Sequence, residues 1–226
     1  TGKPVPETNP PTGTVTINGG EPATKSTLAT LTLALDPGDP EDGAIQLCIS
    51  NTAWPCSAWT AFTGSPTTRT LTRNWTLPSG SGPKPVNVWF RDKWGNTTPA
   101  STPSSTAILL DTTAPVNGKV TAVQGNKKLT LNWSEFKDNT PGSGIKGYRA
   151  VFQQGASAPS SCTSGTPVPG YEGFNNLATT LEHTVVLVNG KSLVNGTTYA
   201  YRVCAIDAVG NMSSGATVTG RPVSTG

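Results

Sequence analysis

Charge and long apolar runs are both scarce in this sequence. Only 13% of its 226 residues are charged, and the net charge of +3 is scattered along the chain. That charge is too weak to predict binding to nucleic acid or to an anionic membrane. Runs of about 18 apolar residues are missing, so we expect no insertion into a bilayer. The first residues lack the charged-then-apolar pattern of a secretion signal, which favours a mature or excised fragment.

The sequence also lacks the common motifs of catalysis. It has no Gly-x-Ser-x-Gly elbow, no His-Glu-x-x-His and no glycine-rich phosphate loop. Its one histidine, His183, follows Glu182 in a predicted strand, where a surface position is the simplest interpretation. A glycosidase would need two opposed carboxylates in a cleft, and a narrow β-sandwich predicts no such cleft. We therefore expect this chain not to be an enzyme.

Glycine and proline are abundant, and one short sequence motif occurs twice. The 25 Gly and 20 Pro suit an all-β protein that is rich in turns. Asp92–Asn96 and Asp207–Asn211 close the two halves with similar sequences, which indicates tandem domains of about 100 residues each. The predicted parts are an extended N-terminal arm at residues 1–11 and domains at residues 12–111 and 112–226.

Apolar residues alternate with polar ones in both halves, as in half-buried strands. Leu31, Leu33 and Leu35 show this period of two most clearly. The other predicted strands cover residues 13–18, 45–49, 75–77, 86–90 and 106–110, then 129–133, 145–152, 181–188, 198–206 and 216–218. Residues 153–176 are expected to form a long loop. Short strands with frequent turns predict two tandem β-sandwiches joined by a short linker.

The four cysteines fall two per half. Cys48 and Cys56 flank a tight polar turn, whereas Cys162 and Cys204 lie far apart in the second predicted sandwich. An even count without Cys-x-x-Cys spacing favours two disulfides over zinc, and disulfides indicate an extracellular or cell-surface location. Chain entropy predicts a contribution of about 2.6 kcal/mol for the short loop and about 4 kcal/mol for the long one. The alternative is four unpaired, buried thiols.

Residues 115–223 resemble a fibronectin type III domain of bacterial extracellular proteins. The resemblance is carried by Trp133, by Leu193–Tyr199 and by Tyr201–Asp207. It implies that Trp133 points inward from the second strand. It also implies that the hydroxyl of Tyr199 ties a corner of the sandwich to nearby backbone.

Residues 11–111 resemble a bacterial immunoglobulin-like domain. Gly13–Gly19, Ser57–Trp59 and Asp92–Asn96 carry this resemblance, although the cysteine pair and Trp94 depart from the family's usual pattern. Together the two resemblances imply an all-β chain of tandem immunoglobulin-like and fibronectin type III β-sandwiches. Such domains serve as spacers, adhesin stalks or accessory modules of secreted enzymes, and the fold alone identifies no partner.

Acidic residues are predicted to meet at the pole of each domain that receives the incoming chain. The candidate ligands are Asp111 of the linker with Asp138 and Asp207 at the pole of the second domain, and Glu7, Asp36, Asp39, Asp42 and Asp92 at the pole of the first. Calcium takes six to eight oxygen ligands from irregular loops, so it is the cofactor that these residues would hold. The alternative is that each aspartate bonds the backbone of its own turn.

Four aromatic residues on predicted loops are candidates for contact with a partner: Trp54, Trp94, Tyr171 and Phe174. Exposed rings stack on sugars or anchor protein partners. The alternatives are that Trp54 covers the neighbouring disulfide and that Trp94 folds back over a strand edge. The remaining tryptophans, Trp59, Trp75, Trp89 and Trp133, are predicted to lie in the cores.

The leading hypothesis is a non-catalytic structural segment of a larger secreted or cell-surface bacterial protein. It would act as a spacer or adhesion scaffold, with neighbouring domains of the parent protein as its partners. One alternative is an accessory module that holds an extracellular hydrolase to a polysaccharide or a protein. Another is a fibre subunit whose arm, residues 1–11, pairs with an edge strand of the next copy, although the prolines of the arm weaken this idea.

Overall fold

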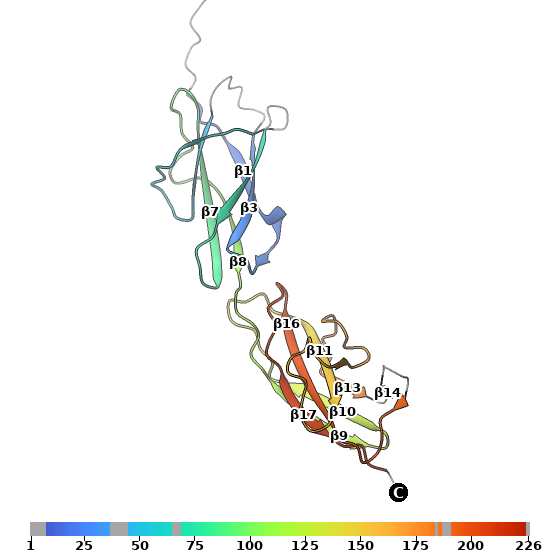
Figure 1. Ribbon diagram of the computed structural model, residues 1–226. Coiled ribbons are helices and arrows are strands. Elements are labelled where there is room, and N and C mark those ends of the chain that lie inside the picture. Colours follow the sequence, from blue (N-terminus) through green and yellow to red (C-terminus); the bar gives the residue numbers. More distant parts are fainter. Residues whose placement is uncertain (1–7, 37–44, 65–68, 184, 187–190, 225–226) are drawn as a thin grey trace, which may run out of the picture. The chain divides into compact units, whose positions relative to one another are not determined.

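The computed structural model describes residues 8–36, 45–64, 69–183, 185–186 and 191–224, and the chain divides into two compact units, residues 1–111 and 112–226. Almost all of the regular structure is β-strand (Figure 1). None of the described segments forms a helix with the length and hydrophobicity of a transmembrane span. The predicted all-β sandwich fold is confirmed.

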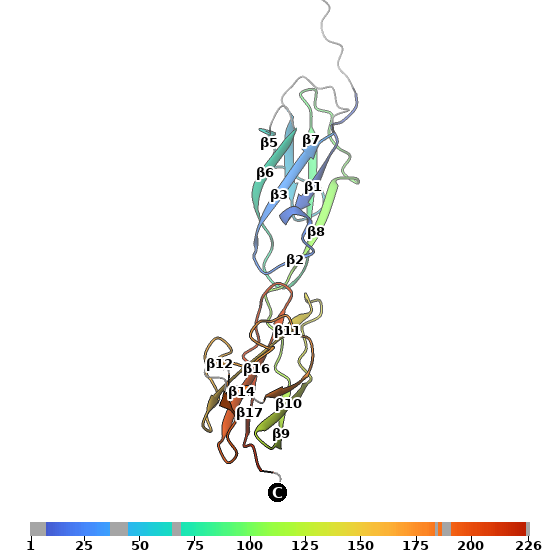
Figure 2. The same cartoon turned by 90° about the vertical axis from the view of Figure 1, so that its right-hand side faces the viewer.

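The first unit packs a three-stranded sheet against a five-stranded one (Figure 2). The smaller sheet has the order β1-β3-β6, formed by Gly13–Ile17, Leu28–Leu35 and Thr70–Thr76. The larger has the order β2-β8-β7-β4-β5, formed by Ala23–Thr24, Ser104–Leu110, Gly82–Arg91, Gln46–Ser50 and Thr60–Ala61. A short 3-10 turn, η1, spans Asn18–Gly20 after β1.

The core of the first unit follows from the alternation in its strands. Leu31 and Leu33 of β3 are fully buried and share one hydrophobic cluster with Val88 and Phe90 of β7. Successive residues of a strand point to opposite faces, so this alternation turns one face of each sheet toward the other. Each fully buried side chain of this size contributes about 1.5–3 kcal/mol.

One pairing in the first unit is parallel. Strand β2 runs beside β8 in the same direction, with Ala23 opposite Leu109. The Leu109 N–H donates to the Pro22 carbonyl at 3.1 Å, and the Asp111 N–H donates to the Thr24 carbonyl at 2.8 Å. The short strand β2 is therefore hydrogen-bonded to the last strand of the unit, and the bonding continues to Asp111, where the unit ends.

The second unit also packs two main sheets. One has the order β13-β10-β9, formed by Thr180–His183, Lys128–Ser134 and Lys119–Gly125. The other has the order β12-β11-β16-β17, formed by Thr166–Pro167, Ile145–Gln154, Tyr199–Asp207 and Ala216–Gly220. A two-stranded pair is added by β14, Val185–Val186, and β15, Lys191–Ser192.

Aromatic rings dominate the core of the second unit. Trp133 is buried, and its ring lies edge-on to Tyr148 and Tyr171 at centroid distances of 5.7 and 5.3 Å. Tyr199 is also buried, and its hydroxyl accepts a hydrogen bond from the Val194 N–H at 3.1 Å. Trp133 and Tyr199 therefore take the positions that the sequence predicts for them.

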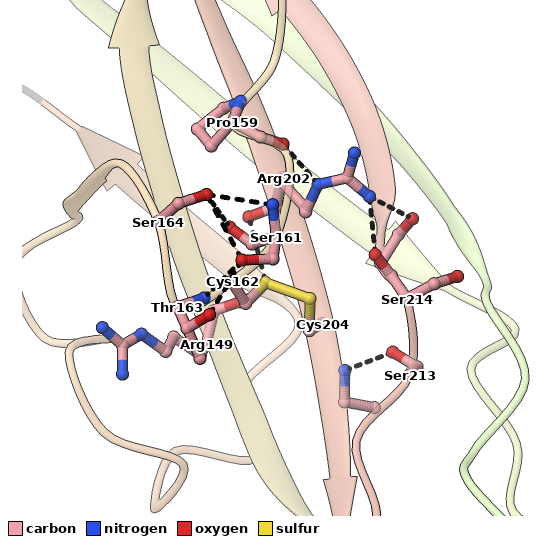
Figure 3. The surroundings of a disulfide bond; sticks show 12 residues. Arg149, Pro159, Ser161, Cys162, Thr163, Ser164, Arg202, Cys204, Ser213 and Ser214 are labelled. Carbon is pink, nitrogen blue, oxygen red and sulfur yellow. Dashed lines mark hydrogen bonds between the residues drawn. A yellow bond between two sulfur atoms is a disulfide. The ribbon is translucent and has the colours of Figure 1, made fainter.

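Both predicted disulfides form. Cys48 of β4 bonds Cys56, eight residues later, and Cys162 bonds Cys204 of β16 across a separation of 42 residues. No cysteine in the chain is left as a free thiol. Because Cys162 lies in a loop, its bond attaches that loop to the sheet (Figure 3).

Arg202 also attaches the same loop to the sheet, through hydrogen bonds. Its Nε donates to the Pro159 carbonyl at 2.6 Å, and its Nη1 donates to the Ser214 carbonyl at 2.6 Å (Figure 3). Bonds from a charged guanidinium are stronger than neutral ones. This one side chain of β16 thus holds two separate loops of the second unit.

Several strand predictions were incomplete. Strand β9 was not predicted, because its apolar residues are few and only Val120 and Ala122 pack on the core. The expected loop at 153–176 contains β12, which pairs with β11 over two residues. The strand predicted at 181–188 is formed as β13 and β14, with residues 184 and 187–188 outside the described part of the chain. The two-residue strands β2, β5 and β15 are too short to give a periodic signal.

Candidate functional site

Three of the predicted calcium ligands come together. One carboxylate oxygen each from Asp111, Asp138 and Asp207 lies within 4.8 Å of the others. Asp111 and Asp207 are completely buried, and Asp138 is partly exposed. Carboxylates this close repel one another when all are ionised, and a divalent cation would remove that repulsion.

Two of the three aspartates, Asp138 and Asp207, also accept hydrogen bonds within their own turns, as in the alternative hypothesis. Asp207 accepts hydrogen bonds from the backbone N–H groups of Val209 and Asn211 at 3.1 and 2.8 Å, and from the Asn211 side chain at 2.7 Å. Asp138 accepts one from the Gly144 N–H at 2.6 Å. The turn bonds explain why positions 138 and 207 are acidic without requiring an ion.

The described candidate ligands of the first unit, Asp36 and Asp92, each accept hydrogen bonds from nearby residues. Asp92 accepts bonds from the Trp94 and Asn96 N–H groups, both at 2.8 Å, and from the Asn96 side chain at 2.7 Å. Asp36 is exposed and accepts a bond from the Thr12 hydroxyl at 2.6 Å. Glu7, Asp39 and Asp42 lie outside the described residues. Within the described segments, the three carboxylates around Asp111 are the group that could hold a metal ion.

Two of the four candidate aromatic residues are exposed on loops, as predicted. Trp54 is 41% exposed and Trp94 is 39% exposed. Trp54 lies edge-on against Trp89 at a centroid distance of 5.5 Å, and Trp89 is fully buried beside the Cys48–Cys56 disulfide. Trp54 thus covers the disulfide region with one part of its ring and shows the rest to solvent.

The other two aromatic candidates are corrections. Tyr171 is only 5% exposed, because its ring packs on Trp133 in the core and its hydroxyl donates to the Thr180 carbonyl at 3.0 Å. Burial raises the pKa of Tyr171. Phe174 is partly buried against the Cys162–Cys204 cluster, with the Arg149 guanidinium 5.9 Å from its ring centre. Both rings fold inward because the long loop closes over the sheet.

The prediction of core tryptophans holds in part. Trp89 and Trp133 are buried. Trp75 is half-buried, and its indole N–H donates to the Asn51 side chain at 2.7 Å. Trp59 is also half-buried and packs on the disulfide cluster. Rings at the edge of a small sandwich keep one face in water because too little chain surrounds them.

The prediction that His183 lies on the surface is wrong. It is 1% exposed, its Nδ1 shares a hydrogen bond of 2.8 Å with the Tyr201 hydroxyl, and its ring lies 4.5 Å from that of Phe152. Burial raises the pKa of Tyr201 well above its ordinary value. A histidine enclosed in this way cannot meet a substrate, so its role is packing.

A surface hollow of about 560 Å³ lies at the end of β7, around the turn that carries Trp94. We call it the Trp94 hollow; it is lined by Gln46, Arg91, Asp92, Lys93, Trp94, Gly95 and Thr97. Arg91 donates from Nε and Nη2 to the Gln46 side-chain oxygen at 3.0 and 2.5 Å. Its guanidinium also lies 4.4 Å from the centre of the Trp59 ring. Its orientation is therefore fixed from two sides.

No pattern in the sequence predicts a site at Gln46 or Arg91. The two residues are opposite each other in the antiparallel pair of β4 and β7, although 45 positions separate them in sequence. The signal that could have found them is the register of that pair, because cross-strand neighbours share one face of a sheet.

Comparisons with known proteins add little to this geometry. No family model matches the chain, and no curated protein matches it. A solved structure of fibronectin(III)-like modules of Clostridium thermocellum CbhA matches with 16% sequence identity and a TM-score of 0.40. That match covers 92% of this chain and 94% of the other. The fold is therefore assigned from the strand pairing and not from this likeness.

Proposed function

We propose that the chain is a non-catalytic scaffold of a larger secreted or cell-surface bacterial protein, built from an immunoglobulin-like domain and a fibronectin type III domain. One observation carries the proposal: each unit has its own hydrophobic core and its own disulfide. Domains that are complete in this way can be placed in a row as spacers between other domains. Disulfides persist in oxidising compartments, which supports a location outside the cytoplasm.

The buried position of His183 supports the absence of catalysis. The ring is enclosed by Phe152 and Tyr201, so it cannot act as a general base toward a bound substrate. A scaffold is also expected to turn over no substrate.

Thermal unfolding of the full chain and of its two halves tests the scaffold proposal. We expect the full chain to show two calorimetric transitions, each reproduced by the separate polypeptides 12–111 and 112–226. Failure of either half to fold alone would contradict independent domains. Transitions that merge into one cooperative unit in the full chain would contradict it as well.

A ligand-binding accessory module is the second candidate function. The observation that favours it is Trp94, which is 39% exposed on a turn of the first unit and lines the surface hollow there. Large exposed rings are uncommon on a surface that only separates other domains. Co-sedimentation of the protein with insoluble polysaccharides would separate a binding module from a spacer, because a spacer stays in the supernatant.

Two further hypotheses stay predictions. Calcium binding by Asp111, Asp138 and Asp207 agrees with their proximity, but the turn hydrogen bonds of Asp138 and Asp207 offer a competing explanation. The fibre hypothesis concerns an arm of which residues 1–7 lie outside the described part of the chain. Sedimentation of the chain at increasing concentration would test for assembly.

A further inference from the structure

We infer that the Trp94 hollow of the first unit is a saccharide-binding site, in which a pyranose ring stacks on the Trp94 indole and its oxygen atoms accept bonds from Arg91. The inference rests on the second candidate function, the ligand-binding module, and names its site and ligand class. The melting experiment on the halves tests the scaffold separately, so either proposal can fail without the other.

The turn that carries Trp94 does not need an indole. In the second unit the first aspartate of the turn Asp207–Asn211 accepts the same set of hydrogen bonds as the first aspartate of the turn Asp92–Asn96 in the first unit. Val209 stands there in place of Trp94. The chain therefore builds this turn equally well with a small aliphatic residue, and the large exposed ring has another purpose.

The turn presents the indole in a fixed position. The Asp92 carboxylate is almost fully buried and accepts the N–H of Trp94 itself at 2.8 Å. Gly95 follows with a φ of +92°, a conformation that favours glycine. The backbone under the ring is thus held before any ligand arrives, which lowers the entropy lost on binding.

The polar wall of the hollow suits the oxygens of a sugar. Arg91 is bonded to the neutral amide of Gln46, which orients the guanidinium without neutralising its charge. A planar guanidinium donates to sugar hydroxyls and to carboxylates alike. The Lys93 ammonium lies over one face of the Trp94 ring, 5.3 Å from its centre, so the sugar would stack on the other face. An aromatic face beside fixed polar donors matches the two kinds of surface on a sugar ring.

The size of the hollow fits a small ligand. Its volume of about 560 Å³ falls within the range of 300–1,000 Å³ found for small-molecule sites. The lining is polar or charged apart from Gly95 and the one large ring of Trp94. Such a lining suits a ligand that carries many hydroxyl groups more than an apolar one.

Affinity electrophoresis of the full chain through gels of soluble polysaccharides tests the site. The probes are two neutral glycans, xyloglucan and galactomannan, and two acidic ones, polygalacturonate and alginate. We expect retardation by at least one probe. Acidic ligands would bind more weakly as salt increases and neutral ones would not, so the salt series tells the two sources apart.

Three variants identify the residues. Trp94→Val copies the turn of the second unit and should weaken binding about tenfold, whereas Trp94→Phe should lose less because a ring remains. Arg91→Lys keeps the charge but loses the planar fork, and it should also weaken binding. Trp54→Ala is the matched control, because Trp54 is equally exposed in the same unit but does not line the hollow. Its binding should stay unchanged.

The melting temperature of each variant shows whether it is folded. The inference is overturned if no probe retards the folded protein, if Trp94→Val binds as well as the wild type, or if Trp54→Ala loses as much binding as Trp94→Val. Capture of a protein partner through Trp94 without any glycan binding would overturn it too.

Discussion

Replacing Cys162 and Cys204 with alanine should destabilise the second unit more than the corresponding change of Cys48 and Cys56 destabilises the first. The bonded cysteines are 42 residues apart in the second unit and 8 apart in the first. Chain-entropy estimates give about 4 and about 2.6 kcal/mol for the two bonds. A typical domain has only about 5–15 kcal/mol of stability, so the longer loop accounts for a large share of it.

The corresponding shifts in melting temperature are large enough to separate. With about 2.1 cal/mol/K of unfolding entropy per residue, a domain of this size should lose about 16 °C for the long loop and about 11 °C for the short one. Differential scanning calorimetry of the full chain measures both, because each variant should move one transition and leave the other in place.

The cavity left by the sulfur atoms needs its own control. Cys162 and Cys204 are almost fully buried, so the alanine pair also removes packing. The wild type kept in a strong reductant loses the bond but keeps both sulfurs, and it should reproduce most of the shift. Equal losses in the two units, or a larger loss for the Cys48–Cys56 pair, would refute the dependence on loop length.

Three further predictions concern single sites. The raised pKa of Tyr201 keeps its hydroxyl protonated in the folded state, so the free energy of unfolding should be unaffected below about pH 10 and fall above it by up to about 1.4 kcal/mol per pH unit. Urea unfolding from pH 8 to 11 should show a shallower fall for Tyr201→Phe than for the wild type. Equal slopes for the two proteins would contradict this cause. If calcium binds, the free energy of unfolding should be about 2.7 kcal/mol higher with calcium at 100 times its Kd than with a chelator, and Asp138→Asn should abolish this difference. A chelator that does not change the stability of the wild type would refute the calcium hypothesis. Gly215→Ala should cost about 2 kcal/mol or more, because φ is +87° there and a Cβ would lie 2.6 Å from the Cys204 sulfur. Gly155→Ala, with positive φ but open space, should cost less in the same melting assay.

The sequence predicted what depends on local periodicity. The alternation of Leu31 and Leu33 placed β3 and its buried face, and the even cysteine count placed both disulfides. Strand β9 was not predicted because it has few apolar residues, so its apolar alternation is weak; only its Val120 and Ala122 pack on the core, and both are half-buried. Prediction thus succeeded where a strand carries large apolar side chains on one face.

The site depended on contacts that local patterns do not encode. Tyr171 and His183 were placed on the surface because nothing near them in sequence shows that their rings turn inward. Gln46 and Arg91 meet only through the register of β4 and β7. Trp94 was found, because a large ring on a predicted loop stands out from the sequence alone.

The parallel pairing of β2 with β8 gives the first unit a direction of mechanical strength. The outgoing chain leaves the unit at the end of β8, whereas β2 follows β1 within the unit. Tension on the outgoing chain therefore pulls β8 lengthwise past β2, and the bonds at Leu109 and Asp111 are strained together. Bonds strained together resist more force than bonds that open one after another, as in a hairpin pulled apart at its tip. A tether under flow or traction would benefit from that difference.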